Sequence, residues 1–245
     1  HNGSRGLGDV YKRQYQESEY RFASLSKLLD HLDDSIAIVL LGPPGCGKTT
    51  VLGHYERVIH EAALLSDQTE LPLIVRHNLR AYRPLQEGEP LLSPQAWLED
   101  YWQQNYPKLP DLADLMDNNP VLFLLDGLNE IPHSAADDYL QQMGRWREWL
   151  SELDINYPGN RAVFTCRSID YSGGLSDYQQ EHIVVSQVRF AELDDDTIQA
   201  YLKTALGDEE GMAVAARLKA IPRVTLKRSP FFLELAVKQY LARGK

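Results

Sequence analysis

The chain lacks several features that would place it in a familiar class of protein. Its 245 residues include two cysteines, Cys46 and Cys166, which is too few for a disulfide framework. No apolar run approaches the length of a membrane-spanning helix, and no signal-peptide pattern is visible. We therefore expect a soluble protein of the reducing cytoplasm, with no membrane partner.

Basic residues are scarce relative to acidic ones. Lys and Arg number 25 against 35 Asp and Glu, which gives a formal net charge of −10. This balance argues against a general nucleic-acid-binding surface, although it leaves a local basic patch open. No internal repeat or low-complexity segment is visible. Hydrophobic residues make up 43% of the chain, enough for the core of one large domain, or of one domain and part of another.

What the chain does contain is a glycine-rich loop directly after a short apolar run. Residues 36–41 have the length and composition of a strand buried on both faces. The GPPGCGKT that follows fits the G-x-x-x-x-G-K-[ST] phosphate-loop (Walker A) pattern. Glycines take backbone angles that side chains forbid, and the loop N–H groups form an anion nest at a helix N-terminus. We predict a nucleotide site formed by Gly42, Pro43, Pro44, Gly45, Cys46, Gly47, Lys48, Thr49 and Thr50.

Two side chains of this loop have the chemistry that a nucleoside triphosphate requires. In such loops the lysine, here Lys48, reaches the β- and γ-phosphates, and the following hydroxyl, here Thr49, is a ligand for Mg²⁺. The alternative is a glycine-rich strand–helix turn without a ligand. The apolar run before the loop and the helix-forming sequence after it favour the nucleotide site.

A second apolar run ends at a carboxylate. Residues 121–125, VLFLL, predict another buried strand, and Asp126 follows directly. Its carboxylate is a candidate Mg²⁺ ligand, direct or through water, as in a Walker B strand; a turn aspartate beside glycine is the alternative. Glu130, four residues later, is a candidate for orienting or deprotonating the water that attacks the γ-phosphate, or else a solvated loop residue. The predicted metal ligands are therefore Thr49 and Asp126.

The chain between and after these motifs alternates strands with helices. Such alternation predicts an α/β fold with three layers and a mainly parallel five-stranded sheet, followed by the start of a helical subdomain. We place the boundary near Phe190, with a core over 15–190 and a truncated helical subdomain over 191–245. The predicted strands are 36–41, 71–75, 121–125, 162–166 and 182–185, and the predicted helices are 18–32, 49–65, 95–105, 109–116, 134–153, 195–206, 209–219 and 230–241.

The first residues need separate treatment. Residues 4–14, SRGLGDVYKRQ, are similar to the translation of a sequencing adaptor, because residues 9–14 back-translate to a transposon-end sequence. A polar N-terminus is the alternative. We expect residues 1–14 to be an artefact of this kind and exclude them from the fold.

Four segments together resemble a known family. GPPGCGKTT, VLFLLDGLNEI, AVFTCRS and SPFFLELAV are similar to the NACHT domain, the nucleotide-switch module of the STAND class of P-loop NTPases. The resemblance covers about 36–242, and DGLNE is its most family-specific piece. Asn129 departs from the family pattern, because many members carry a second acid there. That departure bears on the rate of hydrolysis more than on nucleotide binding.

The resemblance implies two further site residues. In this class the fourth strand lies between the first and the third, which would bring Arg167 close to the γ-phosphate as a sensor and a fourth catalytic candidate. Pro230 matches the proline that packs on the adenine in related switches. A surface arginine at a strand end and a proline in the first turn of a helix are the alternatives. Cys46 occupies a variable loop position, and we expect Cys166 to be a buried strand residue.

The function implied by the resemblance is a Mg-ATP-dependent signalling switch with slow hydrolysis. ATP is expected rather than GTP, together with Mg²⁺, self-association on activation, flanking effector and sensor domains, and a role in microbial defence. Two other classes stay open. One is a different P-loop ATPase, either ring-forming or a small-molecule kinase, and the other is a nucleotide-binding scaffold without turnover.

Overall fold

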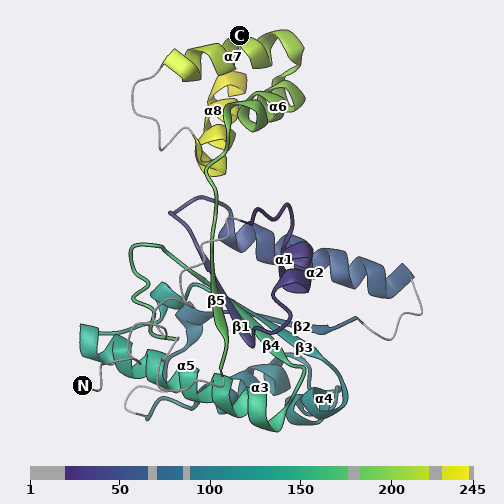
Figure 1. The fold of residues 1–245 in the computed structure, drawn as a ribbon, viewed down its shortest axis with the longest axis vertical. Coiled ribbons are helices and arrows are strands. Elements are labelled where there is room, and N and C mark those ends of the chain that lie inside the picture. The colour runs from purple at the N-terminus through teal and green to yellow at the C-terminus, as the bar shows by residue number, and fades with distance from the viewer. Residues whose placement is uncertain (1–19, 66–70, 85–88, 176–182, 221–227, 243–245) are drawn as a thin grey trace, which may run out of the picture.

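The computed structural model of the chain describes residues 20–65, 71–84, 89–175, 183–220 and 228–242 (Figure 1). The predicted adaptor segment, 1–14, lies outside the described residues. Five strands form one sheet in the order β2-β3-β4-β1-β5, and each neighbouring pair is parallel. The strands are β1 (Ala37–Leu41), β2 (Leu73–Asn78), β3 (Val121–Asp126), β4 (Arg161–Cys166) and β5 (Val185–Arg189). The predicted parallel α/β sheet is confirmed, and so is the place of the fourth strand between the first and the third.

Helices cover both faces of the sheet (Figure 1). Successive residues of a strand point to opposite faces, so a strand buried on both sides reads as a continuous apolar run. Within β1, Ile38 and Leu40 face one hydrophobic cluster while Val39 and Leu41 face another. One face carries α1 (Leu25–His31) and α2 (Lys48–Leu65); the other carries α3 (Pro94–Asn105), α4 (Leu112–Asn118) and α5 (Ala136–Asn156).

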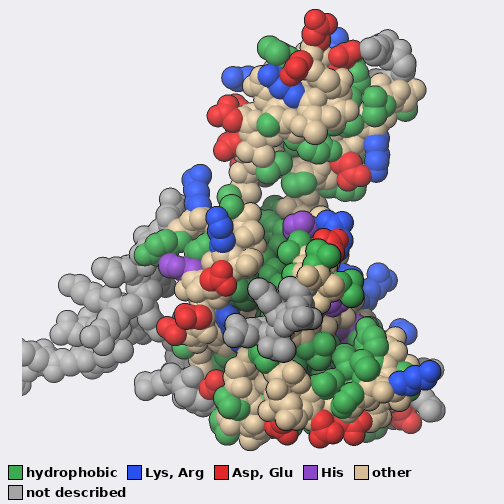
Figure 2. Space-filling view, turned by 90° about the vertical axis from the view of Figure 1, so that its right-hand side faces the viewer, with side chains coloured by type: hydrophobic (Ala, Val, Ile, Leu, Met, Phe, Trp, Pro, Cys, Tyr) green, Lys and Arg blue, Asp and Glu red, His purple; other side chains and the backbone are tan. Residues whose placement is uncertain are grey.

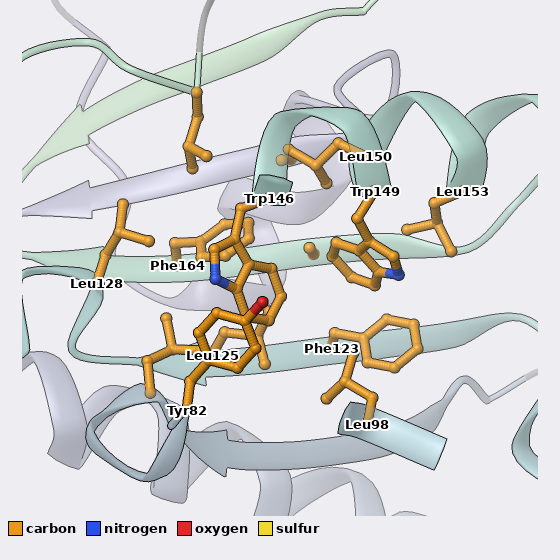
Figure 3. Close-up of a cluster of buried hydrophobic side chains, with 14 of the residues drawn as sticks. Tyr82, Leu98, Phe123, Leu125, Leu128, Trp146, Trp149, Leu150, Leu153 and Phe164 are labelled. Carbon is orange, nitrogen blue, oxygen red and sulfur yellow. The ribbon is translucent and has the colours of Figure 1, made fainter. Parts of the chain in front are cut away.

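Aromatic rings fill the space between α5 and the sheet (Figure 3). Trp146 and Trp149 of α5 are buried, with their ring centroids 5.3 Å apart in an edge-to-face arrangement. Trp146 also meets Phe164 of β4, and Trp149 meets Phe123 of β3, at 5.7 and 5.2 Å. Edge-to-face pairs of this kind add to the free energy gained by burying the rings. These contacts pack α5 tightly against β3 and β4.

Several predicted elements have wrong boundaries: β2, α4 and α5 differ from their predicted ranges by two or three residues at each end, and the fifth strand and the first helix differ most. The fifth strand was expected at 182–185, but β5 runs from Val185 to Arg189 and pairs with β1 along its whole length. Its side chains are half-buried or exposed because it is an edge strand, so backbone pairing and not an apolar run defines it. The first helix, expected over 18–32, spans Leu25–His31 among the described residues, because the Ser24 side chain accepts from the Lys27 N–H and caps it there.

The last three helices pack around a hydrophobic cluster of their own. We call α6 (Asp195–Leu206), α7 (Asp208–Ala220) and α8 (Pro230–Ala242) the helical segment. Its cluster is built from Ile198, Leu202, Val214, Leu218, Leu233 and Val237. In the space-filling view it stands as a separate lobe above a narrow waist (Figure 2). Within the described ranges, no helix has both the length and the apolar character needed to cross a membrane.

Candidate functional site

The candidate site lies at the carboxyl ends of the parallel strands, where α/β proteins bind ligands at the point where strand order reverses. There β1, which pairs with both β4 and β5, leads into the glycine-rich loop, and β3 ends at Asp126. A cavity of about 620 Å³ opens at this edge of the sheet. Ten of the predicted site residues line it: Pro44, Gly45, Gly47, Lys48, Thr49, Thr50, Asp126, Glu130, Arg167 and Pro230.

The glycine-rich loop has the backbone that its sequence predicts. Gly45 and Gly47 have φ values of 76° and 100°, in the region that side chains rarely adopt. Helix α2 begins directly after them at Lys48. The Lys48 ammonium donates to the carbonyl oxygens of Gly42 and Pro43, at 2.8 and 3.0 Å. The positive charge of this side chain therefore lies across the mouth of the loop, at the edge of the cavity.

A hydroxyl and a carboxylate meet beside that charge. The Thr49 hydroxyl, in the first turn of α2, donates to Asp126 Oδ2 at 2.7 Å. The other carboxylate oxygen, Oδ1, accepts from the Thr165 hydroxyl, which in turn accepts from the Gly127 N–H at 2.8 Å. Asp126 is only 7% exposed, so these hydrogen bonds compensate for its loss of water. They also fix the direction of both carboxylate oxygens.

The turn after β3 brings Glu130 back to the cavity. Gly127 has a φ of 83° and precedes a short 3-10 helix, η3 (Leu128–Glu130). The Glu130 N–H donates to the Gly127 carbonyl at 2.7 Å and closes the turn. The backbone angle favours glycine, and a Cβ atom at position 127 would lie 3.2 Å from Glu130 Cδ, so the glutamate side chain would have to shift. The family-specific DGLNE stretch is thus a turn that folds its glutamate onto the cavity wall.

Arg167 follows β4 and lies on the same wall. Its backbone N–H donates to the Asn129 side-chain oxygen at 3.0 Å, which joins the end of β4 to the turn after β3. Its guanidinium lies 4.0 Å from the Asp170 carboxylate, in an exposed and therefore weak ion pair. Asn129, the residue that departs from the family pattern, is thus engaged by the backbone of its neighbour.

The helical segment supplies the opposite wall. Pro230 and Phe231, in the first turn of α8, line the cavity, as do Leu193, Thr197 and Tyr201 of α6 and the stretch before it. Two donors at the start of α8 reach the glycine-rich loop. The Ser229 hydroxyl and the Phe231 N–H both donate to the Gly45 carbonyl, at 3.0 and 3.3 Å.

Three predicted nucleotide-binding residues lie outside the cavity lining. Gly42 and Pro43 contribute their carbonyls to Lys48 instead, and Cys46 packs with its sulfur 3.8 Å from the Lys48 ammonium nitrogen. Cys166 is fully buried, and burial raises the pKa of its thiol to about 11. A thiol of this kind stays protonated at neutral pH, as expected for a packing residue.

Sequence reasoning missed several residues of the site. Thr165 was recoverable, because it is a polar residue at the end of an otherwise apolar strand. Tyr201, Phe231 and Ser229 carried no such signal, since they lie in α6, in α8 and directly before α8, which approach the loop only in the folded chain.

The residues at the loop fit a hard divalent cation. Magnesium prefers oxygen ligands and keeps several waters, so one hydroxyl and one carboxylate suffice when phosphate oxygens complete the shell. The Thr49 and Asp126 oxygens converge as such a pair. No cluster of three or more His, Cys, Asp or Glu side chains suited to a metal occurs in the described ranges, so an all-protein cage is not formed there.

Two solved structures, with TM-scores of 0.50 and 0.52, show the same fold at low sequence identity. A chain of the HORMA:CdnC:Trip13 complex of E. coli MS115-1 matches with a TM-score of 0.50 and 15% identity, covering 96% of this chain and 73% of that one. The ORC1 protein of Aeropyrum pernix, in complex with DNA, matches with a TM-score of 0.52 and 16% identity. The match covers 89% of this chain and 59% of that chain. Drosophila ORC bound to DNA gives a TM-score of 0.49 at 16% identity, and the match covers 89% of this chain and 59% of that chain. The chain thus spans well under two thirds of both ORC chains.

The family model gives the more specific result. A comparison with curated proteins gave no match. The model of the NACHT domain matches residues 37–209, which begin at β1 and include the glycine-rich loop, the DGLNE turn, β4 and α6. The match covers well over half of the chain and contains most of the residues that line the cavity. The chain therefore belongs to the NACHT domain family of P-loop NTPases.

Proposed function

We propose that this NACHT domain is a Mg-ATP-dependent switch that hydrolyses ATP slowly. The observation that carries the proposal is the makeup of the single cavity described above. A lysine, a hydroxyl–carboxylate pair, a glutamate and an arginine from the core line one side, and α6 and α8 of the helical segment line the other. A nucleotide in this cavity would touch both parts of the molecule.

Lys48 and the loop amides would hold the phosphates. The ammonium now satisfies two carbonyl oxygens of its own loop, and a β- or γ-phosphate would replace these neutral partners with charged ones. Hydrogen bonds between two charged groups are stronger than those to neutral acceptors, so the exchange favours binding. The dipole of α2, which begins at Lys48, adds to the attraction.

Thr49 and Asp126 would hold Mg²⁺. In such a site the cation neutralises charge on the β- and γ-phosphates. The Thr165 hydroxyl and the Thr49 hydroxyl fix the two Asp126 oxygens, so little reorganisation is needed when the cation binds. This preorganisation favours tight binding of the Mg-ATP pair.

Glu130 would orient or deprotonate the attacking water, and Arg167 would respond to the γ-phosphate. Both line the cavity, and Arg167 is linked through its backbone to the Glu130 turn by Asn129. An exposed arginine with only a weak ion pair is free to move to a phosphate. Loss of the γ-phosphate would therefore alter the position of Arg167 and, through Asn129, the turn after β3.

The conformational change would be a hinge movement of the helical segment. That segment has its own hydrophobic cluster, and Pro230 in α8 is the proposed contact for the adenine. We propose a boundary near Phe190, which the separate cluster supports. Self-association on activation, flanking effector and sensor domains, and a role in microbial defence are proposed from family membership alone.

The test is to measure Mg-ATP binding and phosphate release for the chain and for two variants. Lys48→Ala removes the charged phosphate contact and is expected to weaken ATP binding by about 10- to 150-fold. Glu130→Gln keeps a side chain of the same size and is expected to retain ATP affinity and lose turnover.

Matched surface variants control for general damage. Lys27→Ala in α1 and Glu148→Gln in α5 change exposed residues of the same type and should behave like the unaltered chain. ATP affinity that is unchanged in Lys48→Ala would refute the phosphate site. Unchanged turnover in Glu130→Gln would remove its catalytic role.

A further inference from the structure

The helical segment contacts the glycine-rich loop at one backbone atom. The Gly45 carbonyl oxygen accepts two hydrogen bonds from the start of α8, one from the Ser229 hydroxyl at 3.0 Å and one from the Phe231 N–H at 3.3 Å. A Cβ atom at position 45 would lie 2.9 Å from Phe231 Cβ and 3.2 Å from Ser229 Oγ. The loop and the helix therefore approach as closely as glycine allows.

Holding this carbonyl sets the direction of the next amide. The peptide unit is planar and trans, so the Gly45 carbonyl and the Cys46 N–H point to opposite sides of it. With the carbonyl turned toward α8, the Cys46 N–H points back into the loop, where it donates to the Pro43 carbonyl oxygen at 3.4 Å. The direction of the Gly45 peptide unit thus fixes the turn from Pro43 to Cys46, within the loop whose N–H groups we propose to bind phosphate.

The residue before Ser229, Arg228, binds the connection between β5 and α6. The Arg228 guanidinium donates to the Leu193 carbonyl at 2.6 Å and to the Asp195 carboxylate at 2.9 Å. The Leu193 N–H also lies 3.4 Å from the Arg228 carbonyl oxygen. Leu193 belongs to the connection between β5 and α6, and Asp195 is the first residue of α6. A chain of polar contacts thus runs from the loop through Ser229 and Arg228 to the connection between β5 and α6.

The two lobes have separate hydrophobic clusters. The hydrophobic clusters of the core and of the helical segment share no buried residue in the described ranges, and the lobes meet at a narrow waist (Figure 2). The hydrogen bonds from Ser229 and Phe231 to Gly45 are direct contacts across this waist. The Ser229–Gly45 hydrogen bond can therefore influence both the conformation of the glycine-rich loop and the orientation of the helical segment.

We propose that Ser229 is a positioning residue that holds the phosphate loop in its binding conformation. Together with Arg228 it forms a clasp between Gly45 and the hinge. While the clasp is closed, the Gly45 peptide unit holds the turn from Pro43 to Cys46 in place; when the helical segment swings away, that peptide unit is released and the loop loses the shape that binds phosphate. Nucleotide affinity and lobe orientation are thereby coupled through one carbonyl oxygen. This inference rests on the proposed function, because it concerns the same phosphate site.

The test compares Mg-ATP affinity in Ser229→Ala, Ser229→Thr and a control. Removing the hydroxyl is expected to weaken ATP binding by about three- to tenfold, the effect of one hydrogen bond. Threonine restores a hydroxyl and should restore affinity. Thr204→Ala removes an exposed hydroxyl of α6 in the same lobe, which donates to the Ala200 carbonyl of its own helix, and should change nothing.

A second measurement reports on the loop without any nucleotide. Hydrogen exchange of a peptide covering residues 42–50 should be faster in Ser229→Ala than in the Thr204→Ala control, while peptides from α6 and α7 exchange as before. Uniformly faster exchange would show a general loss of folding and would overturn the proposal. So would equal ATP affinity in Ser229→Ala and Thr204→Ala. If the unaltered chain binds no ATP, the proposed function fails instead, and the exchange data alone decide whether the clasp exists.

Discussion

Thr49 and Asp126, separated by 77 positions in the chain, share a hydrogen bond of 2.7 Å at the carboxyl ends of the strands. The first turn of α2 carries one residue and the end of β3 carries the other. Both are the oxygen donors that a hard cation prefers. Their meeting joins the two sequence motifs into one site, and it gives a direct test of metal binding.

Replacing Asp126 with Asn should remove the effect of magnesium on ATP binding. The amide loses the negative charge that attracts Mg²⁺ but keeps an oxygen for the Thr165 hydroxyl. We expect ATP affinity measured with EDTA to stay within about twofold of the unaltered chain, and the gain in affinity on adding Mg²⁺ to disappear. Titration calorimetry with and without Mg²⁺ measures both. Asp34→Asn, in an exposed turn, is the control; a magnesium effect that survives in Asp126→Asn would contradict the assignment.

Asn129 should matter for turnover through its contact with the Arg167 backbone. Asn129→Ala removes the acceptor of a 3.0 Å hydrogen bond and frees the end of β4 from the turn that carries Glu130. We expect phosphate release to fall by about 2- to 12-fold while ATP affinity is kept. Asn129→Asp retains an oxygen acceptor and should keep most of the turnover. Equal rates in Asn129→Ala and the unaltered chain would show that this contact does not support catalysis.

His77 should make the fold sensitive to acid. Its ring lies against Trp97 and Tyr101, with centroids 4.4 and 3.8 Å away, and burial lowers the pKa of His77 to about 4 from its ordinary 6.5. The unfolded chain therefore takes up a proton before the folded one, so the stabilising contribution is present above pH 6.5 and is lost as pH falls toward 4.

A non-titrating ring at this position isolates that effect. His77→Phe keeps an aromatic side chain and should lose less stability than the unaltered chain between pH 7 and pH 5. Chemical unfolding at the two pH values measures the difference. His60→Gln changes an exposed histidine of α2 and serves as the control. The same loss in His77→Phe and the unaltered chain would show that another group titrates.

The central strands could be predicted because they are buried on both faces. β1 and β3 appear as continuous apolar runs, and the observed bounds differ from the predicted ones by a single residue. The edge strands are different. β2 continues through the polar residues Arg76, His77 and Asn78, because its backbone pairs with β3 as far as Asp126. Side-chain patterns report burial, so they say little about a strand whose pairing is carried by backbone groups at the edge of a sheet.

The same distinction holds for the site. Residues within the two motifs were predicted by local spacing, since a loop and the helix after it fix their geometry. The contacts of Arg167 with Asn129, and of Ser229 with Gly45, depend on how distant segments pack. The place of β4 in the sheet came from family resemblance, because strand order is a property of the whole fold. A single sequence holds no local signal for any of these.

The central claim is that the nucleotide sets the orientation of the helical segment. The most direct test places spin labels at positions 148 and 212, which lie on exposed faces of α5 and α7, in a Cys46→Ser background whose ATP binding is first compared with that of the unaltered chain. Distance distributions are measured without nucleotide, with Mg-ADP, and with Mg-ATP in the slow Glu130→Gln variant. We predict different distributions for ADP and ATP, and no change with either nucleotide in Lys48→Ala. One unchanged distribution in all three states, despite bound nucleotide, would contradict the account.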